Sequence, residues 1–154
     1  MLVADDHEIF RKRVIRAVAE SFPGTEADEA GDGCTALALL DKGRYDLVLL
    51  DISMPGRSGL EVLKEIRSRR HATRVLVLSM HPEEEYAARA LRAGASGYVA
   101  KEKAAEELVG AIRAVLAGGV YVSASADRRR VTRKSGPIAN RRTASIDRKE
   151  ETRR

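Results

Sequence analysis

The chain is poor in several residue types, and each shortage excludes a class of protein. Its 154 residues include no Trp, two Phe, four Tyr, four Pro and one cysteine, Cys34. A single cysteine cannot form an internal disulfide, and its place in the apolar-periodic stretch Gly33–Leu40 predicts a packed thiol rather than a reactive one. No apolar run is long enough to span a membrane and the N-terminus lacks a signal-peptide layout, so we expect a cytoplasmic protein without membrane association.

What the chain does have is aliphatic residues and an uneven distribution of charge. Apolar residues make up 44% of the chain and aromatic residues 4%, which predicts one domain with a core of Val, Leu, Ile and Ala. Residues 127–154 carry eleven Lys and Arg against four Asp and Glu, whereas residues 1–126 carry 17 against 19. The basic character therefore belongs to a tail and says little about the partners of the folded part.

Short aliphatic runs alternate with amphipathic stretches, which is typical of βα units and a parallel sheet. The expected strands are Leu2–Asp5, Thr25–Ala30, Asp46–Asp51, Arg74–Ser79 and Gly97–Ala100. The expected helices are His7–Ser21 (apolar face Ile9, Phe10, Val14, Ala17 and Val18), Thr35–Lys42, Gly59–Ser68, Glu83–Ala93 and Ala104–Ala117. We predict an α/β fold with a doubly wound, five-stranded parallel sheet of the flavodoxin type, in strand order 2-1-3-4-5.

Carboxylates follow the first and third of these strands. Asp5 and Asp6 come directly after an apolar run, and Asp51 ends another and enters a turn that contains Pro55. In this fold ligands bind outside the carboxyl ends of the strands, between the first and third strands, so these carboxylates should meet. Because carboxylates at one point disfavour each other's ionised forms, the cluster predicts a cation site, and oxygen ligands suit Mg²⁺ in a phosphoryl-transfer site.

Two possible phosphoryl ligands end neighbouring strands. Ser79 closes the fourth strand and Lys101 follows the fifth, so a hydroxyl and an ammonium group reach the same edge of the sheet. Taken singly, Ser79 is as well explained as an ordinary strand end and Lys101 as a solvated loop charge. Together with the three carboxylates, however, five polar side chains stand at strand ends along the same edge of the sheet, and this coincidence favours a functional site: Asp5, Asp6, Asp51, Ser79 and Lys101.

These motifs resemble the receiver domain of bacterial two-component response regulators over residues 2–125. The resemblance rests on Asp5-Asp6-His7, Asp51-Ile52-Ser53-Met54-Pro55-Gly56 with Gly59, Ser79, and Gly97-Tyr98-Val99-Ala100-Lys101. The stretches 78–81 and 90–95 are similar to the LuxR/NarL-type subfamily, whose output is a helix-turn-helix. The resemblance implies a phosphoacceptor switch in a phosphorelay, part of a transcription regulator, and not an enzyme with an external substrate.

For the metal and the acceptor, the resemblance implies a defined role for each residue. Asp51 would accept the phosphoryl group from the phosphohistidine of a sensor histidine kinase. Asp6 and Asp51 would bind Mg²⁺ directly, with the backbone carbonyl of Ser53 as a third ligand and Asp5 acting through water.

The same resemblance implies a switch. Lys101 would pair with the phosphoryl group and Ser79 would move to hydrogen-bond it, after which Tyr98 would swing inward. That motion would alter the face of the fourth helix, fifth strand and fifth helix. Tyr98 also has a simpler interpretation as a strand aromatic that packs against its neighbours.

We divide the chain into a receiver domain, residues 1–121, and a disordered basic linker and tail, residues 122–154. Residues 134–139 resemble the subfamily's linker and residues 145–151 the opening of its DNA-reading domain, so we expect that domain to be missing or truncated here. The tail could hold nucleic acid weakly through phosphates, without sequence readout, because it has neither interleaved aromatics nor a recognition helix.

Two other functions compete with the switch. A homodimer through the fourth-helix, fifth-strand and fifth-helix face, or through the first and fifth helices, would also suit a dimerisation or partner-binding module that acts without phosphorylation. A Mg²⁺-dependent phosphatase with an aspartyl nucleophile is disfavoured, because Ser53 stands where a second acid is expected and no cap domain is present. A zinc site is also disfavoured, because His7, His71 and His81 lack ligand spacing.

Overall fold

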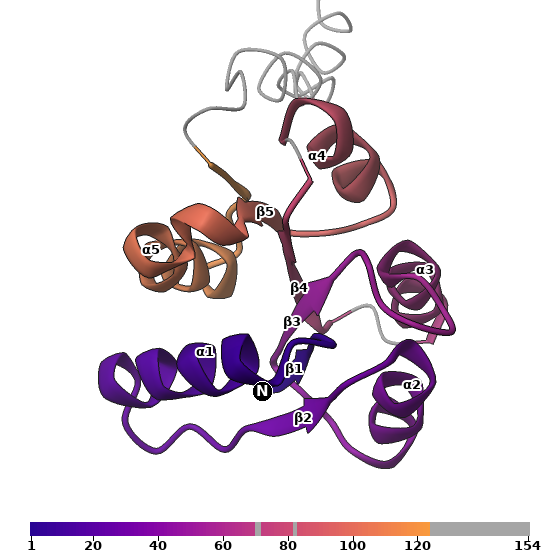
Figure 1. Cartoon of the computed structure of the whole chain (residues 1–154), viewed down its shortest axis with the longest axis horizontal. Coiled ribbons are helices and arrows are strands. Elements are labelled where there is room, and N and C mark those ends of the chain that lie inside the picture. The colour runs from indigo at the N-terminus through magenta and orange to yellow at the C-terminus, as the bar shows by residue number, and fades with distance from the viewer. Residues whose placement is uncertain (70–71, 82, 124–154) are drawn as a thin grey trace, which may run out of the picture.

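The computed structural model describes residues 1–69, 72–81 and 83–123 and consists of alternating strands and helices (Figure 1). The strands are β1 (Leu2–Ala4), β2 (Asp28–Ala30), β3 (Leu47–Asp51), β4 (Arg74–Ser79), β5 (Gly97–Ala100) and β6 (Tyr121–Val122). The helices are α1 (Glu8–Ser21), α2 (Gly33–Lys42), α3 (Gly59–Arg69), α4 (Glu83–Arg92) and α5 (Ala104–Leu116), with a 3₁₀ turn η1 (Lys101–Lys103) before α5.

The strands form one parallel sheet in the order β2-β1-β3-β4-β5-β6. Helices α1 and α5 cover one face, and α2, α3 and α4 cover the other (Figure 1). The predicted doubly wound class and the order of the first five strands are confirmed. A sixth strand, β6, was not predicted: two residues are too few to show a period, and its pairing with β5 depends on the tertiary structure.

Each face of the sheet has its own aliphatic core. Along β3 all five residues are buried, and the side chains of Val48 and Leu50 pack under α2 and α3 while those of Leu47 and Leu49 pack under α1 and α5. A strand covered on both faces must be apolar throughout. The carboxyl end of β3 is therefore the place where the polar side chain of Asp51 can reach solvent or a ligand.

Two local features set the geometry around the sheet's carboxyl edge. The side chain of Asp32 caps α2 by accepting a hydrogen bond from the backbone N–H of Thr35 at 2.7 Å, which lowers the pKa of Asp32. Gly59 begins α3 in close contact with the end of β3: a Cβ there would lie 2.1 Å from the backbone oxygen of Asp51. The start of α3 can thus pack directly against the end of β3 because residue 59 has no side chain.

Two predictions about packing were wrong. Ile9 is expected on the apolar face of α1 but is 73% exposed, because it lies on the same side of the helix as the exposed residues Lys12, Arg13 and Arg16. Cys34 was expected to be packed, but it lies in the first turn of α2 and is exposed. In both cases the helix forms as expected, but the residue lies on its solvent-facing side, whereas the neighbouring residues Phe10 and Gly33 are packed.

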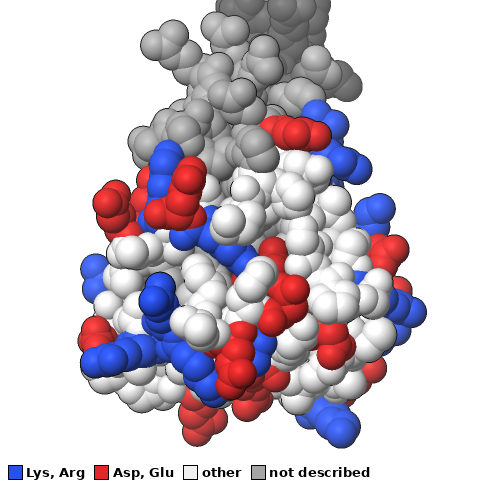
Figure 2. Space-filling view, in the orientation of Figure 1, with Lys and Arg blue, Asp and Glu red and all other residues white. Residues whose placement is uncertain are grey.

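The described chain ends just beyond the predicted domain boundary. Val122 belongs to β6 and Ser123 is buried, so both are part of the packed structure although the boundary was placed at residue 121. The remaining tail, including its basic clusters and the segments 134–139 and 145–151, lies outside the described residues. Among the described helices none is both long enough and apolar enough to cross a membrane. Figure 2 shows acidic and basic side chains intermingled on the face drawn there.

Candidate functional site

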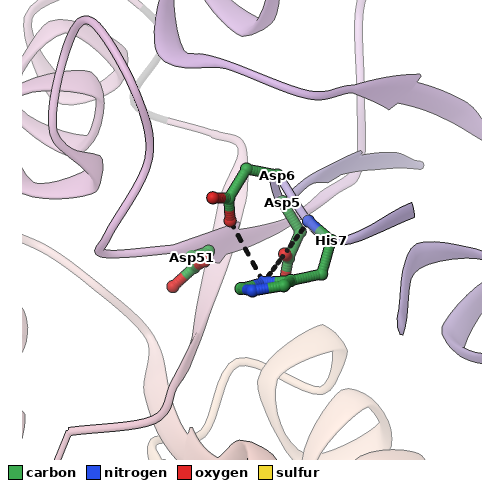
Figure 3. Close-up of side chains that lie close together, drawn as sticks. All are labelled: Asp5, Asp6, His7 and Asp51. Carbon is green, nitrogen blue, oxygen red and sulfur yellow. Dashed lines mark hydrogen bonds and ion pairs between the residues drawn. The ribbon is translucent and has the colours of Figure 1, made fainter. Parts of the chain in front are cut away.

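Four titratable side chains gather at the carboxyl ends of β1 and β3. The side chains of Asp5, Asp6, His7 and Asp51 each offer a ligand atom, and these atoms lie within 4.8 Å of one another (Figure 3). Asp5 and Asp51 are almost fully buried, whereas the Asp6 carboxylate is 32% exposed. The cluster therefore has a buried floor and an open side, as a site that binds a solvated ligand requires.

The turn between β1 and α1 holds Asp5 in place. Its backbone N–H donates to the carbonyl of Ala30 at 2.9 Å, and Arg11 donates to its carbonyl oxygen at 2.6 Å. Its Oδ1 accepts a hydrogen bond from the backbone N–H of His7 at 2.8 Å. The Nδ1 atom of His7 lies 3.1 Å from Oδ1 of Asp5 and 3.1 Å from Oδ1 of Asp6, so the ring links the two carboxylates.

Lys101 supplies the positive charge opposite this cluster. Its Nζ lies 2.6 Å from Oδ2 of Asp5 and 3.1 Å from Oδ2 of Asp51. The same nitrogen lies 4.8 Å from the centre of the Phe10 ring, and the Lys101 side chain is only 5% exposed. Lys101 is thus a buried cation shared between two carboxylates, and not a solvated loop charge.

Burial and the neighbouring charges shift the pKa of the Asp51 carboxyl. Burial raises the pKa of the Asp51 carboxyl above its ordinary value, and Lys101 opposes this rise while the nearby Asp5 carboxylate adds to it. The backbone N–H of Ser53 donates to Oδ1 of Asp51 at 3.2 Å and also favours the ionised form. An additional cation beside Asp51 would lower its pKa.

The donor set fits a hard divalent ion. Oδ2 of Asp5 is buried and has no aligned hydrogen-bond donor; its contact with Lys101 is an ion pair held by charge. Carboxylate oxygens from β1, the following turn and β3 converge on one point, and Asp6 leaves the open side accessible to water. Three carboxylates against one ammonium group leave a net negative charge that such an ion would neutralise.

A chain of hydrogen bonds leads from this cluster to Tyr98 on β5. Oγ of Ser53 lies 2.7 Å from Nε2 of His81. The backbone N–H of His81 donates to Oγ of the fully buried Ser79 at 3.0 Å, and the hydroxyl of Tyr98 donates to the His81 carbonyl at 3.1 Å. The ring of Tyr86 on α4 packs at 4.4 Å from the His81 ring. His81 thus joins the loop after β3, the end of β4, and α4.

The ring of Tyr98 is already inside the protein. The residue is 0% exposed and packs with the core between the sheet and α4. The expected inward swing would start from an outward position, and this conformation is not an outward one. The side chain is both a packing aromatic and a hydrogen-bond donor, so the two interpretations of Tyr98 are compatible.

The structure brings the predicted residues together and adds others. Asp5, Asp51 and Lys101 are in direct contact, and Asp6 joins them through His7. Ser79 is connected through His81, by two hydrogen bonds, to Ser53, whose backbone N–H donates to Asp51. Sequence reasoning set the histidines aside because they lack metal-ligand spacing. Their proximity to the motifs was visible, but their contacts depend on how the loops fold.

Comparison with known proteins identifies the family of this fold and site. A family model described as the response regulator receiver domain matches residues 1–113. The chain therefore belongs to the receiver domain family of two-component response regulators.

Its relatives are transcription regulators of the subfamily expected from the sequence. The chain is 39% identical over 112 residues to the transcriptional regulatory protein NarL of Mycobacterium tuberculosis, covering 73% of this chain and 52% of that protein. It is 37% identical over 122 residues to the transcriptional regulatory protein DegU of Brevibacillus brevis, covering 79% of this chain and 52% of DegU. The chain thus spans about half the length of the curated relatives that it matches.

Solved structures agree with this assignment. A LuxR-family two-component response regulator from Aurantimonas superposes with a TM-score of 0.75 at 36% identity, covering 88% of this chain and 96% of that one. The signal receiver domain of NarL from Mycobacterium tuberculosis superposes with a TM-score of 0.69 at 38% identity, covering 76% and 94%. The similarity lies in the receiver half of these regulators.

Proposed function

We propose that the chain is a phosphoacceptor switch in a phosphorelay, with Asp51 as the acceptor. The observation that carries this proposal is the position of Asp51: a buried carboxylate 3.1 Å from the ammonium group of Lys101, next to Asp5 and Asp6. A merely structural strand end would not need three carboxylates around one lysine, because their mutual repulsion destabilises the fold.

In the transfer, an Asp51 oxygen forms a bond to phosphorus while the bond from phosphorus to the donor's imidazole nitrogen breaks. The electron pair of the broken bond stays on that nitrogen. Lys101 then pairs with the phosphoryl oxygens in place of the Asp51 carboxylate, and its burial keeps the interaction strong. The backbone N–H of Ser53 holds the other Asp51 oxygen and orients the acceptor.

Mg²⁺ is the cofactor that we assign to the acidic cluster. Asp6 and Asp51 would hold the ion with the carbonyl of Ser53, and Asp5 would act through water. When bound, the ion neutralises the carboxylates and the incoming phosphoryl charge. Asp5 and Asp51 also keep Lys101 in place, so the same carboxylates position the cation and the acceptor.

Ser79 is the residue that we expect to report the phosphoryl group to the rest of the molecule. Its hydroxyl now accepts a hydrogen bond from the backbone N–H of His81. To donate to a phosphoryl oxygen it would turn toward Asp51, and the loop after β4 would follow. Because Tyr98 holds the carbonyl of His81, the motion would be transmitted to β5 and α4.

The partners follow from this role. A sensor histidine kinase in the cytoplasm would supply the phosphoryl group, and a transcription-regulating output would receive the signal. A homodimer through α1 and α5, or through α4, β5 and α5, belongs to the same proposal.

Intact-mass measurement after incubation with acetyl phosphate and Mg²⁺ tests the acceptor. The parent chain should gain one phosphate, and Asp51→Asn should gain none. Asp46→Asn is the matched control, because Asp46 lies just before the opposite end of β3 and should leave phosphorylation unchanged. Equal phosphate uptake by Asp51→Asn and the parent would show that the acceptor is another residue. No uptake by the parent would favour the phosphorylation-independent binding module.

A further inference from the structure

The residues that follow α5 return to the sheet and lie beside Tyr98. The backbone N–H of Tyr121 donates to the carbonyl of Ser96, and that of Ser123 donates to the carbonyl of Tyr98, both at 3.1 Å. The Ser123 hydroxyl also donates to Oε2 of Glu107 on α5 at 2.6 Å. We call residues 121–123 the strap; it pairs with the outer edge of β5 and is tied to α5.

Register places a valine of the strap directly against the switch aromatic. Tyr98 pairs with Val77 of β4 on one side and with Val122 of β6 on the other. Side chains of directly paired residues lie on the same face of a sheet, so the Tyr98 ring sits between these two valines. All three residues are buried in the same core.

To leave its buried position, the Tyr98 ring would have to move past the strap. The interior of the sheet lies on the Val77 side, and the hydroxyl end of the ring is bound to the carbonyl of His81. The remaining side is the edge of β5, which Val122 covers at 7% exposure. The close approach of the strap also requires Gly97, where a Cβ would lie 2.6 Å from the carbonyl oxygen of Tyr121.

We propose that the strap holds Tyr98 in its buried position and through it positions His81 and Ser79. The strap is thus a working part of the switch and not the beginning of a passive linker. The connection runs from Val122 to the Tyr98 ring, then to the His81 carbonyl, and from the His81 N–H to the Ser79 hydroxyl. The effect on phosphorylation rests on the proposed function, whereas the effect on Tyr98 does not.

Fluorine NMR of protein labelled with 3-fluorotyrosine measures the position of the ring in the unphosphorylated protein. The chain has four Tyr, and Tyr98→Phe identifies the signal. In the parent, the Tyr98 signal should have the same chemical shift in H₂O and in D₂O. Val122→Ala should make it solvent-sensitive, while the matched control Val120→Ala, at a site 61% exposed, should not. A Tyr98 signal that stays solvent-insensitive in folded Val122→Ala would overturn the proposal.

A second variant pair loosens the strap from outside the core, so that the test survives if Val122→Ala does not fold. Glu107→Ala removes the acceptor of the Ser123 hydroxyl, and Glu106→Ala removes the exposed neighbouring carboxylate. We expect faster hydrogen exchange at the Tyr121 and Ser123 amides in the first variant, together with partial exposure of the Tyr98 label. Fast exchange of both amides with a fully buried label would contradict the proposal.

Titration with beryllium fluoride and Mg²⁺ relates the strap to the acceptor site. If the strap keeps the Tyr98 ring and Ser79 in position, Val122→Ala should need more beryllium fluoride for half-saturation than Val120→Ala does. We expect about a fivefold difference, which corresponds to the lower end of the coupling free energies usual between two sites. Equal midpoints in the two variants would refute the connection to the site. No binding to the parent would instead refute the acceptor assignment and leave the NMR result standing.

Discussion

At the scale of single residues, the site is a balance between buried charges of opposite sign. Lys101 forms ion pairs with Asp5 and Asp51, and among the described residues no other Lys or Arg lies within ion-pair distance of either carboxylate. Buried ion pairs contribute little net stability, but removing one partner leaves an uncompensated charge. We therefore expect Lys101 to matter for folding as well as for the proposed phosphoryl transfer.

Replacing Lys101 with Met should lower the free energy of unfolding at pH 7 by about 3 kcal/mol, because two buried carboxylates lose their cation. Urea unfolding followed by circular dichroism measures the change. Lys64→Met, on the exposed side of α3, should change stability by less than about 0.5 kcal/mol. Adding Mg²⁺ should recover part of the loss in Lys101→Met. If the two variants are equally stable, the ion pairs do not neutralise the cluster.

At the scale of elements, close packing at the carboxyl edge fixes where the loops run. Helix α3 begins against the last residue of β3, and the acceptor loop between them is tied at Ser53 to Asp51 and to His81. Helix α2 begins at its Asp32 cap, and its first residue, Gly33, meets the backbone of Arg57 in the acceptor loop. Small residues at these contacts let two helices and a strand meet around the acceptor.

A pair of glycine substitutions tests this packing. Gly59→Ala would place a Cβ 2.1 Å from the backbone oxygen of Asp51, so the helix start must shift. We expect a loss of about 2 kcal/mol of stability and slower phosphorylation, since the acceptor loop moves with it. Gly110→Ala, within α5 and with no atom near the added Cβ, should raise stability by about 0.5–1 kcal/mol. Thermal unfolding would contradict the packing argument if both variants gained stability.

At the scale of the whole molecule, the acidic site opposes folding while the two aliphatic cores drive it. Burial raises the pKa of Asp51, so the native state holds its proton to a higher pH than the unfolded chain does. The Asp51 carboxyl therefore contributes to the free energy of unfolding at a pH below the ordinary Asp pKa, where it is protonated. This contribution is lost as the pH rises through the raised pKa of Asp51 in the native state. The buried carboxylate of Asp51, which we propose as the phosphoryl acceptor, is therefore retained at a cost to the fold.

Asp51→Asn should be more stable than the parent at pH 7, by on the order of 1 kcal/mol, because it removes the buried charge. The difference should shrink as the pH is lowered from 7 to about 4, because the raised pKa of Asp51 lets the parent carboxyl take up its proton above the ordinary Asp value. Urea unfolding at both pH values measures it. Mg²⁺ should stabilise the parent more than the variant. A parent that is the more stable protein at pH 7 without Mg²⁺ would show that Lys101 outweighs burial.

The amino-acid sequence by itself determined the order of the first five strands and the five helices, and which polar side chains meet at the carboxyl edge of the sheet. Fully apolar runs such as Leu47–Leu50 can be satisfied only in a strand covered on both faces, and parallel strands bring their carboxyl ends to one edge. The positions of Asp5, Asp51 and Lys101 in one cluster follow from those two facts. The carboxyl ends of these strands were predicted to within one residue, because the hydrophobicity of each run is a local property of the sequence.

Only the tertiary structure decided which groups pair and which surfaces remain open. Lys101 forms ion pairs with both Asp5 and Asp51, and His81 contacts the loop after β3, the end of β4, and α4. Strand β6 exists because the edge of β5 offers unpaired backbone groups at the place where the chain leaves α5. Each of these features depends on segments that are distant in sequence, so no local pattern encodes them.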